Sequence, residues 1–215
     1  MKNKWIYFIL ALSLITGGVA YFSLWLPKNN QTYEGTELSG EATDFQLTDQ
    51  NGDTVSLSDF QGKVVVLTFI DSKCTDTCPI TAVHFREVYK QLEKREADQV
   101  VFLGVNVNVE ASTVKDVMET TQAWHLDEIP EWHFLTGSHE ELEPIWKEFG
   151  VSAIHSHDTS SIMHTPGTFL IDRSGHQRWY VSTLMPGEGD VDLSLPLSQL
   201  LLKHIHELLS ENNIS

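Results

Sequence analysis

The sequence predicts an α/β domain with a mostly parallel central sheet, opened by an N-terminal hairpin and preceded by one N-terminal transmembrane helix. Three observations predict it: a long uncharged span at the N-terminus, continuous apolar runs rich in β-branched residues, and segments of helical period between those runs. Strands that alternate with helices are typical of a central sheet covered by helices on both faces.

The N-terminal span runs from Trp5 to Leu26 without a charged residue. A helix rising about 1.5 Å per residue crosses a hydrocarbon core of about 30 Å in that length. Lys2 and Lys4 precede the span, so the positive-inside rule places the N-terminus in the cytoplasm and the rest of the chain outside it. A cleaved signal peptide is the alternative, but the span exceeds the usual apolar region and lacks a small-residue cleavage site.

The remaining chain divides into a tether and one domain. We expect residues 1–26 to be the anchor, the polar residues 27–40 to be a tether, and residues 41–215 to form a single domain on the extracytoplasmic side of the membrane.

The domain begins with a hairpin and a βα unit. Residues 45–47 and 55–57 flank an Asn-Gly turn, which is typical of a short hairpin. Residues 64–70 are a continuous β-branched run, as expected for a strand buried on both faces. Pro79 suits the first turn of the helix that follows, which extends to Leu92.

The same alternation then repeats twice. Residues 100–106 predict a second buried strand, followed by a helix over 112–124 with Ser112 as its N-cap. Residues 132–135 predict a short strand, followed by a helix from about 139 to 149 with an acidic first turn.

The last elements are a hairpin and a helix. Residues 168–171 and 177–180 predict two strands joined by a turn at 172–175, and residues 197–209 carry leucines and isoleucine at helical spacing.

Composition excludes several classes of protein. The chain has 215 residues, 41% of them hydrophobic and 20% charged, which is the balance of a globular protein with a real core. Its formal net charge is −16, whereas nucleic-acid binding requires a basic face, so nucleic acid is not an expected partner. With only two cysteines, the chain is not a disulfide-stapled scaffold.

The two cysteines, Cys74 and Cys78, lie between the first buried strand and its helix. A turn leading into a helix can bring both sulfurs to one side, close enough to bond each other or to bind one ion. The partial positive charge of the helix N-terminus and the adjacent Lys73 both favour a thiolate there. Because a thiolate attacks disulfides and also binds metals, we expect Cys74 and Cys78 to be the catalytic or metal-binding pair, and to form a disulfide when oxidised.

The third candidate residue is His164, just ahead of the strand over 168–171, which we expect to neighbour the cysteine strand in the sheet. Two thiolates and one imidazole suit copper, because sulfur favours Cu(I) and imidazole also accommodates Cu(II). Zinc is chemically possible, but a structural zinc site needs four protein ligands and only three are assigned. His155 and His157 lie nearby and are further candidates for passing an ion inward.

Three segments resemble the Sco/SenC family of copper-handling proteins: residues 40–79, which end in CTDTCP, residues 134–151, and residues 163–175, MHTPGTFLIDRSG. The resemblance covers about residues 40–210. It implies a thioredoxin-like fold, copper bound by Cys74, Cys78 and His164, and a partner in the copper-binding subunit of cytochrome c oxidase.

Two features qualify that resemblance. The family usually carries Asp-Pro after its next strand, where this chain has VNVNVE over residues 105–110, so a partner contact or redox role of that acidic residue does not carry over. In addition, the segment beginning at Pro166 resembles the proline-containing segment that faces the cysteine pair in thioredoxin-like reductases, which favours redox chemistry.

Two functions therefore remain open. The first is a copper metallochaperone for cytochrome oxidase assembly, and the second is an extracytoplasmic thiol–disulfide oxidoreductase that reduces a partner protein. A peroxidase is less favoured, because no arginine lies near the cysteines before Arg86.

Overall fold

The structure is a computed structural model that describes residues 33–155, 162–164, 166–182 and 195–211. Within them the strands and helices are, in chain order, β1 (Thr36–Glu37), β2 (Gln46–Thr48), β3 (Thr54–Ser56), η1 (Leu57–Phe60), β4 (Val64–Ile70), α2 (Thr77–Gln91), α3 (Lys94–Ala97), β5 (Val100–Asn106), η2 (Val109–Ala111), α4 (Val114–Ala123), η3 (Leu126–Glu128), β6 (Trp132–Leu135), α5 (His139–Glu148), β7 (Ala153–His155), β8 (Ile162–His164), β9 (Thr168–Ile171), β10 (Gln177–Val181) and α6 (Leu197–Ser210).

The central sheet is mixed. Its six strands lie in the order β1-β10-β9-β4-β5-β6. The pairs β4–β5 and β5–β6 are parallel, whereas β4–β9, β9–β10 and β10–β1 are antiparallel. The prediction of a mostly parallel sheet is therefore wrong, since three of the five pairings are antiparallel.

The reversal arises at β9, beside β4. A parallel neighbour is reached by a single crossover, usually one helix, as α2 and α4 provide for β5 and β6. Between β6 and β9 the chain instead passes through α5 and the separate hairpin β7–β8. An apolar run in a sequence indicates burial but not direction, so the pattern could not reveal that β9 runs opposite to β4.

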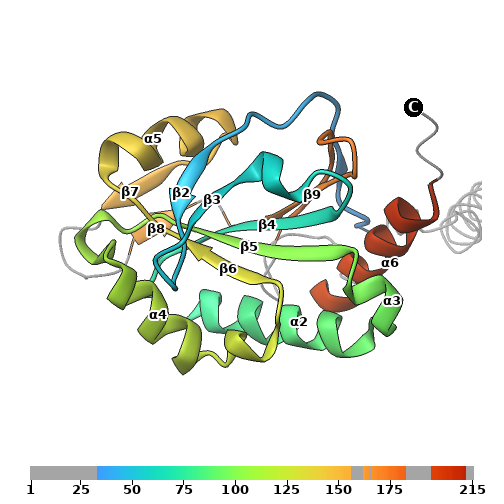
Figure 1. The fold of residues 1–215 in the computed structure, drawn as a ribbon, viewed down its shortest axis with the longest axis horizontal. Coiled ribbons are helices and arrows are strands. Elements are labelled where there is room, and N and C mark those ends of the chain that lie inside the picture. Colours follow the sequence, from blue (N-terminus) through green and yellow to red (C-terminus); the bar gives the residue numbers. More distant parts are fainter. Residues whose placement is uncertain (1–32, 156–161, 165, 183–194, 212–215) are drawn as a thin grey trace, which may run out of the picture. The chain divides into compact units, whose positions relative to one another are not determined.

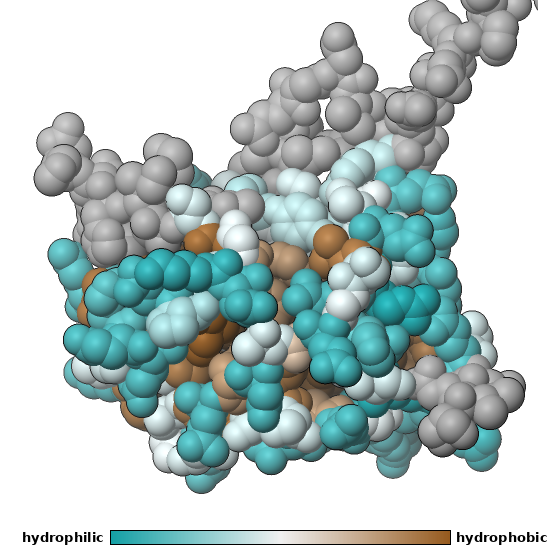
Figure 2. Space-filling model, turned by 90° about the horizontal axis from the view of Figure 1, so that it is seen from above, coloured by the Kyte–Doolittle hydropathy of each residue, from teal (hydrophilic) through white to brown (hydrophobic). Residues whose placement is uncertain are grey.

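Hydrophobic clusters cover both faces of the sheet. Alternate residues of β4 point to opposite sides: Val64, Val66 and Ile70 pack with α2, α4 and α6, whereas Val65, Leu67 and Phe69 pack with the β2–β3 hairpin, η1 and α5. Figure 1 shows α2 and α4 below the sheet and α5 above it. Seen from the α5 side, the surface is largely hydrophilic, with hydrophobic residues partly visible between the polar ones (Figure 2).

Most predicted elements are confirmed, with small shifts at their ends. The N-cap of α4 is Thr113, one residue after the predicted Ser112. The Thr113 hydroxyl accepts a hydrogen bond from the backbone N–H of Asp116, and the Asp116 carboxylate accepts one from the backbone N–H of Thr113. The hairpin β7–β8, which pairs Ala153 with His164, was not predicted.

The N-terminal boundary of the domain also differs from the expected one. β1 pairs with β10, and the Tyr33 hydroxyl accepts a hydrogen bond of 2.7 Å from the backbone N–H of Ser182. Residues 33–40, expected as part of the tether, therefore contribute an edge strand to the sheet. Among the residues that the structure describes, no helix is long and apolar enough to span a membrane, and the predicted anchor, residues 1–26, lies outside them.

Candidate functional site

The cysteine pair lies at the junction of β4 and α2. β4 ends at Ile70, α2 begins at Thr77, and Asp76 caps the helix by accepting a hydrogen bond from the Thr77 N–H. Cys78 is thus the second residue of the helix, and Cys74 lies in the turn before it. The predicted placement of both cysteines at a helix N-terminus is confirmed.

Cys74 is partly exposed and has a stabilised thiolate. Hydrogen bonding by the Cys78 side chain, together with the Cys78 backbone N–H at 3.4 Å from the Cys74 Sγ, lowers the pKa of Cys74 to about 6 despite its partial burial. The Asp76 carboxylate, 3.1 Å from the same sulfur, acts in the opposite direction because it favours the protonated thiol.

Cys78 has the opposite environment. Its side chain is 4% exposed, and the hydrogen bond to Cys74, burial, and the charges of Cys74 and Asp71 all raise its pKa. Below it lies a small cavity lined by Thr68, Thr81 and the Pro166–Gly167 segment, among others. The surroundings therefore favour a thiolate at the accessible sulfur of Cys74 and a thiol at the shielded sulfur of Cys78. The structure shows no disulfide between them, so the disulfide stays a prediction.

The antiparallel direction of β9 places the Pro166–Gly167 segment at the site. Thr168, the first residue of β9, pairs with Thr68, near the end of β4, and the Thr68 hydroxyl donates a hydrogen bond of 2.9 Å to the Gly167 carbonyl. The prediction that the strand after His164 neighbours the cysteine strand is confirmed. If β9 ran parallel to β4, its other end would face the cysteines.

His164 is the last residue of β8, two residues before Pro166. Two Cα-to-Cα steps of about 3.8 Å keep its Cα within roughly 8 Å of the Pro166 Cα. The structure describes the backbone of His164 but not its side chain. Among the side chains that it does describe, no three His, Cys, Asp or Glu residues form a group able to hold a metal ion.

The other candidate histidines are His155, which ends β7, and His157, which lies outside the described residues. β7 pairs with β8 so that His155 is opposite Ile162 rather than His164.

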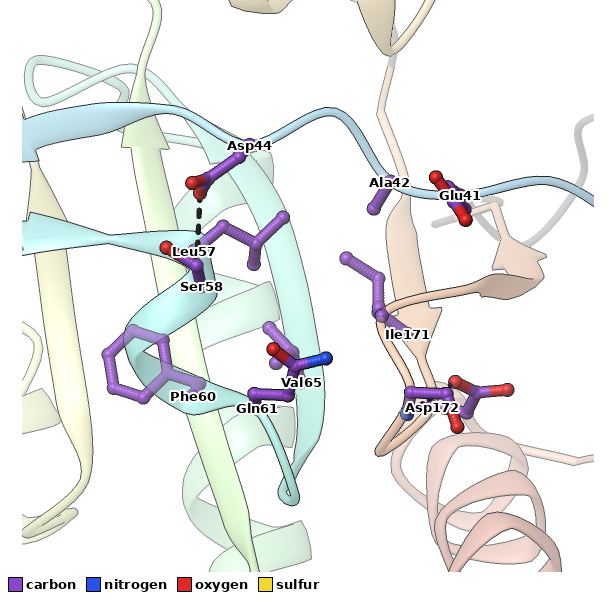
Figure 3. A pocket seen from close by; sticks show the side chains of 12 residues that line it. Glu41, Ala42, Asp44, Leu57, Ser58, Phe60, Gln61, Val65, Ile171 and Asp172 are labelled. Atoms are coloured by element: carbon purple, nitrogen blue, oxygen red, sulfur yellow. Dashed lines mark hydrogen bonds between the residues drawn. The ribbon is translucent and has the colours of Figure 1, made fainter. Parts of the chain in front are cut away.

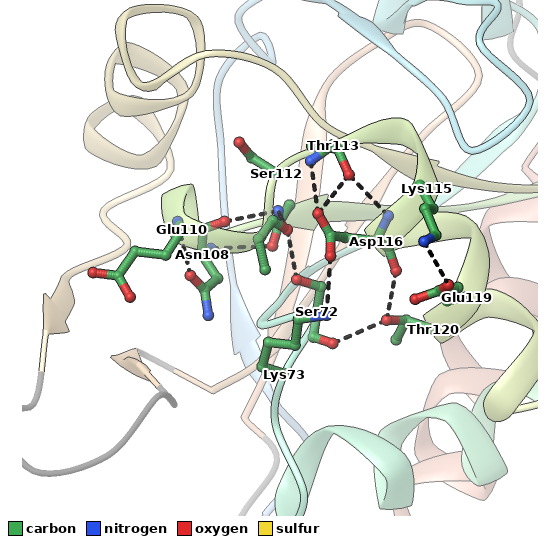
Figure 4. Close-up of polar contacts among 12 residues, drawn as sticks. Ser72, Lys73, Asn108, Glu110, Ser112, Thr113, Lys115, Asp116, Glu119 and Thr120 are labelled. Carbon is green, nitrogen blue, oxygen red and sulfur yellow. Dashed lines mark hydrogen bonds and ion pairs between the residues drawn. The ribbon is translucent and has the colours of Figure 1, made fainter.

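Polar contacts missed by the sequence interpretation support the cysteine turn. Asp71 and Ser72 follow β4 and are buried, and their contacts reach the segment after β5. The Ser72 hydroxyl donates to the Ala111 carbonyl at 2.7 Å, and Lys73 forms an ion pair of 3.0 Å with Asp116 (Figure 4). A polar pair directly after a strand with a single polar residue was the available signal, because buried polar groups need partners.

A larger cavity, of about 250 Å³, lies away from the cysteines. It is lined by Val65, at the start of β4, and by Ile171 and Asp172, at the end of β9, with Glu41 and Asp44 at its edge (Figure 3). None of its lining residues is a cysteine or histidine. We therefore place the candidate site at the cysteine pair, where the reactive groups are.

A family model described as SCO1/SenC matches residues 34–190 of the chain. The chain is 26% identical over 188 residues to the SCO2-like protein of Rickettsia conorii, across 81% of this chain and 88% of that protein.

Solved structures agree with the sequence comparison. The apo Sco1 protein from Thermus thermophilus is 26% identical and superposes with a TM-score of 0.65, covering 82% of this chain and 97% of that one. The structure of Bradyrhizobium japonicum ScoI with copper bound is 23% identical, with a TM-score of 0.62 and coverage of 79% and 99%. The thioredoxin domain of a thiol-disulfide oxidoreductase from Bacteroides vulgatus is 16% identical and superposes with a TM-score of 0.53, with coverage of 80% and 98%. The fold is therefore thioredoxin-like, as the sequence resemblance implied.

Proposed function

Because the chain belongs to the SCO1/SenC family, we propose that it binds copper through Cys74, Cys78 and His164 and delivers it during assembly of the copper-binding subunit of cytochrome c oxidase. The observation that supports this proposal is the position of the two cysteines, which are not joined in a disulfide, beside the start of β9, a strand that begins four residues after His164.

The donor set fits copper. Two cysteine sulfurs are soft ligands suited to Cu(I), and an imidazole extends the site to Cu(II). Cys74 is already largely a thiolate at neutral pH, whereas Cys78 must release its proton when metal binds. A partly exposed Cys74 also gives an incoming or outgoing ion a sulfur that a partner protein can reach.

His164→Ala tests the ligand assignment. We expect it to weaken copper binding, most strongly for Cu(II), because imidazole is the one proposed ligand that favours that valence. A matched control is His206→Ala, which removes an exposed histidine on α6 that contacts Glu96 at 3.5 Å. Affinities for both valences are measured by competition with chelators of known strength, using the full chain.

Three outcomes are informative. A loss of copper affinity in His164→Ala but not in His206→Ala supports the assignment. Equal copper affinity in His164→Ala and the parent contradicts it. If His164→Ala retains copper, His155→Ala and His157→Ala identify whether a neighbouring histidine is the ligand instead.

A second function, thiol–disulfide exchange, is favoured by the asymmetry of the sulfurs. An accessible thiolate at Cys74 can attack the disulfide of a partner, forming a mixed disulfide and releasing one partner thiol, and Cys78 can then displace the second partner thiol. Cys78→Ser should therefore accumulate the mixed disulfide, and Cys74→Ser should not. Failure of both variants to trap a cysteine-containing partner would count against this function.

We also propose that residues 1–26 anchor the protein with its domain outside the cytoplasm. The uncharged span and the lysines before it support this placement.

A further inference from the structure

Asp71 is a fully buried carboxylate directly after β4, with 0% of its surface exposed. Its Oδ1 accepts two hydrogen bonds, one of 2.8 Å from the backbone N–H of Lys73 and one of 2.7 Å from the Asn108 side chain. Its backbone carbonyl also accepts a bond of 3.1 Å from the Cys74 N–H. A single residue thus ties the start of the cysteine turn to the segment after β5.

The orientation of the Asn108 amide is fixed by its other contact. Its Oδ1 accepts a bond of 3.0 Å from the backbone N–H of Glu110, so its Nδ2 must be the group that faces Asp71. Asn108 is 1% exposed, and its own backbone N–H donates to the Asn106 side chain at 3.0 Å. Asn108 therefore presents a donor that is itself held in place.

The strands make the Asp71–Asn108 contact possible. β4 and β5 are parallel and end side by side, with Ile70 opposite Asn106, and the ladder continues with a bond of 3.0 Å from the Val107 N–H to the Ile70 carbonyl. The first residues beyond both strands are therefore close enough for side chains to meet. A buried polar group costs free energy when it lacks a hydrogen-bond partner, so these contacts hold the two segments in one geometry.

We propose that Asp71 and Asn108 are positioning residues, whose hydrogen bond fixes the turn that brings Cys74 and Cys78 together. This inference rests on the proposed function in taking the two cysteines as the working pair. A disulfide forms only when both sulfurs are within a narrow range of distance and direction, so a displaced turn lowers the equilibrium constant for its formation.

Three variants distinguish position from charge. Asn108→Asp sets two carboxylates against each other and should lower the equilibrium constant for disulfide formation against glutathione at least tenfold, which is about 30 mV for this two-electron couple. Asn108→Ser removes the amide donor without adding charge and should act in the same direction. Asp71→Asn keeps an acceptor for Lys73 and Asn108, so its change should be small.

The potential of the full chain is measured in glutathione buffers without copper, with thermal unfolding of each variant recorded in parallel. The matched control is Asp49→Asn, another buried carboxylate that accepts two backbone N–H bonds, in the β2–β3 turn. It should lower stability and leave the potential unchanged. If Asn108→Asp does not fold, Asn108→Ser still decides.

The inference is overturned if the Asn108 variants keep the parent potential, or if Asp71→Asn alone shifts it as far as Asn108→Asp. Copper affinity measured on the same proteins separates this result from the proposed function. A parent chain that binds no copper would contradict the copper assignment, whereas the redox series would still test Asp71 and Asn108.

Discussion

Cys74 and Cys78 are four residues apart and differ in the properties that govern thiol chemistry. Cys74 is partly exposed, and donors from Cys78 stabilise its thiolate, whereas Cys78 is buried and its pKa is raised. The difference comes chiefly from the hydrogen bond between the two side chains and from the burial of Cys78, and the Cys78 N–H directed at the Cys74 sulfur adds to it. The accessible sulfur is therefore the one that meets a partner first.

This asymmetry predicts the pH dependence of alkylation. In the reduced, metal-free chain, the rate of Cys74 alkylation should rise with pH to half its maximum near pH 6, because the thiolate is the nucleophile and the pKa of Cys74 is lowered to about 6. Cys78 should stay unmodified across this range. Peptide mapping after iodoacetamide treatment gives both rates.

The dependence of the Cys74 midpoint on the Cys78 side chain provides the control. Cys78→Ala removes the side-chain donor, so its Cys74 midpoint should move upward toward the ordinary cysteine value, whereas Cys78→Ser keeps a donor and should move it less. Equal midpoints in the parent and Cys78→Ala would contradict this explanation of Cys74.

The sequence was sufficient to locate the two cysteines, because an apolar strand followed by Pro79 indicates where the helix starts. It was not sufficient to find the contact between Asp71 and Asn108, which are 37 residues apart and meet only because their strands are parallel neighbours. Long-range polar contacts of this kind depend on strand order, which no local pattern encodes.

Among the strands, β9 has the largest effect on the site. Its direction was not predictable from its apolar run, yet that direction places Pro166 and Gly167 against Cys78. The helices were easier to predict, since capping residues and hydrophobic spacing are local signals. The one-residue difference at α4 arises because the Thr113–Asp116 pair satisfies both partners of a capping box.

Gly167, the residue before β9, lies close to the ring of Tyr180 on β10. A Cβ on this residue would overlap the Tyr180 ring, whose hydroxyl donates a bond of 2.6 Å to the Pro166 carbonyl. Gly167→Ala should therefore displace Tyr180 and lower the free energy of unfolding by about 1–3 kcal/mol, as overpacking does. Denaturant unfolding of the reduced chain measures this change.

A double-mutant cycle tests the cause. Tyr180→Leu should remove most of the additional cost of Gly167→Ala, because the overlapping ring is gone. Strictly additive effects of the two substitutions would show that the Tyr180 ring is not the obstacle.

The whole chain carries its acidic charge on a domain that follows an uncharged N-terminal span. If residues 1–26 are an anchor, protease added to cells stripped of their outer layers, with the cytoplasmic membrane still sealed, should digest the domain while a cytoplasmic marker protein survives. The same treatment after replacement of residues 1–26 by a cleavable secretion signal should find the domain free of the membrane. A full chain that stays protected and fractionates with soluble cytoplasmic proteins would contradict the proposed placement.

Copper binding by the cysteine pair is the central claim, and its dependence on the oxidation state of the sulfurs tests it most directly. The full chain is titrated with Cu(I) under anaerobic conditions, once with both thiols reduced and once with the Cys74–Cys78 disulfide formed, in the presence of a competing chelator. The reduced chain should retain about one copper ion, because both thiolates are available as ligands, and the oxidised chain should retain none. A reduced chain that binds no copper, or an oxidised chain that binds it equally well, would contradict the account.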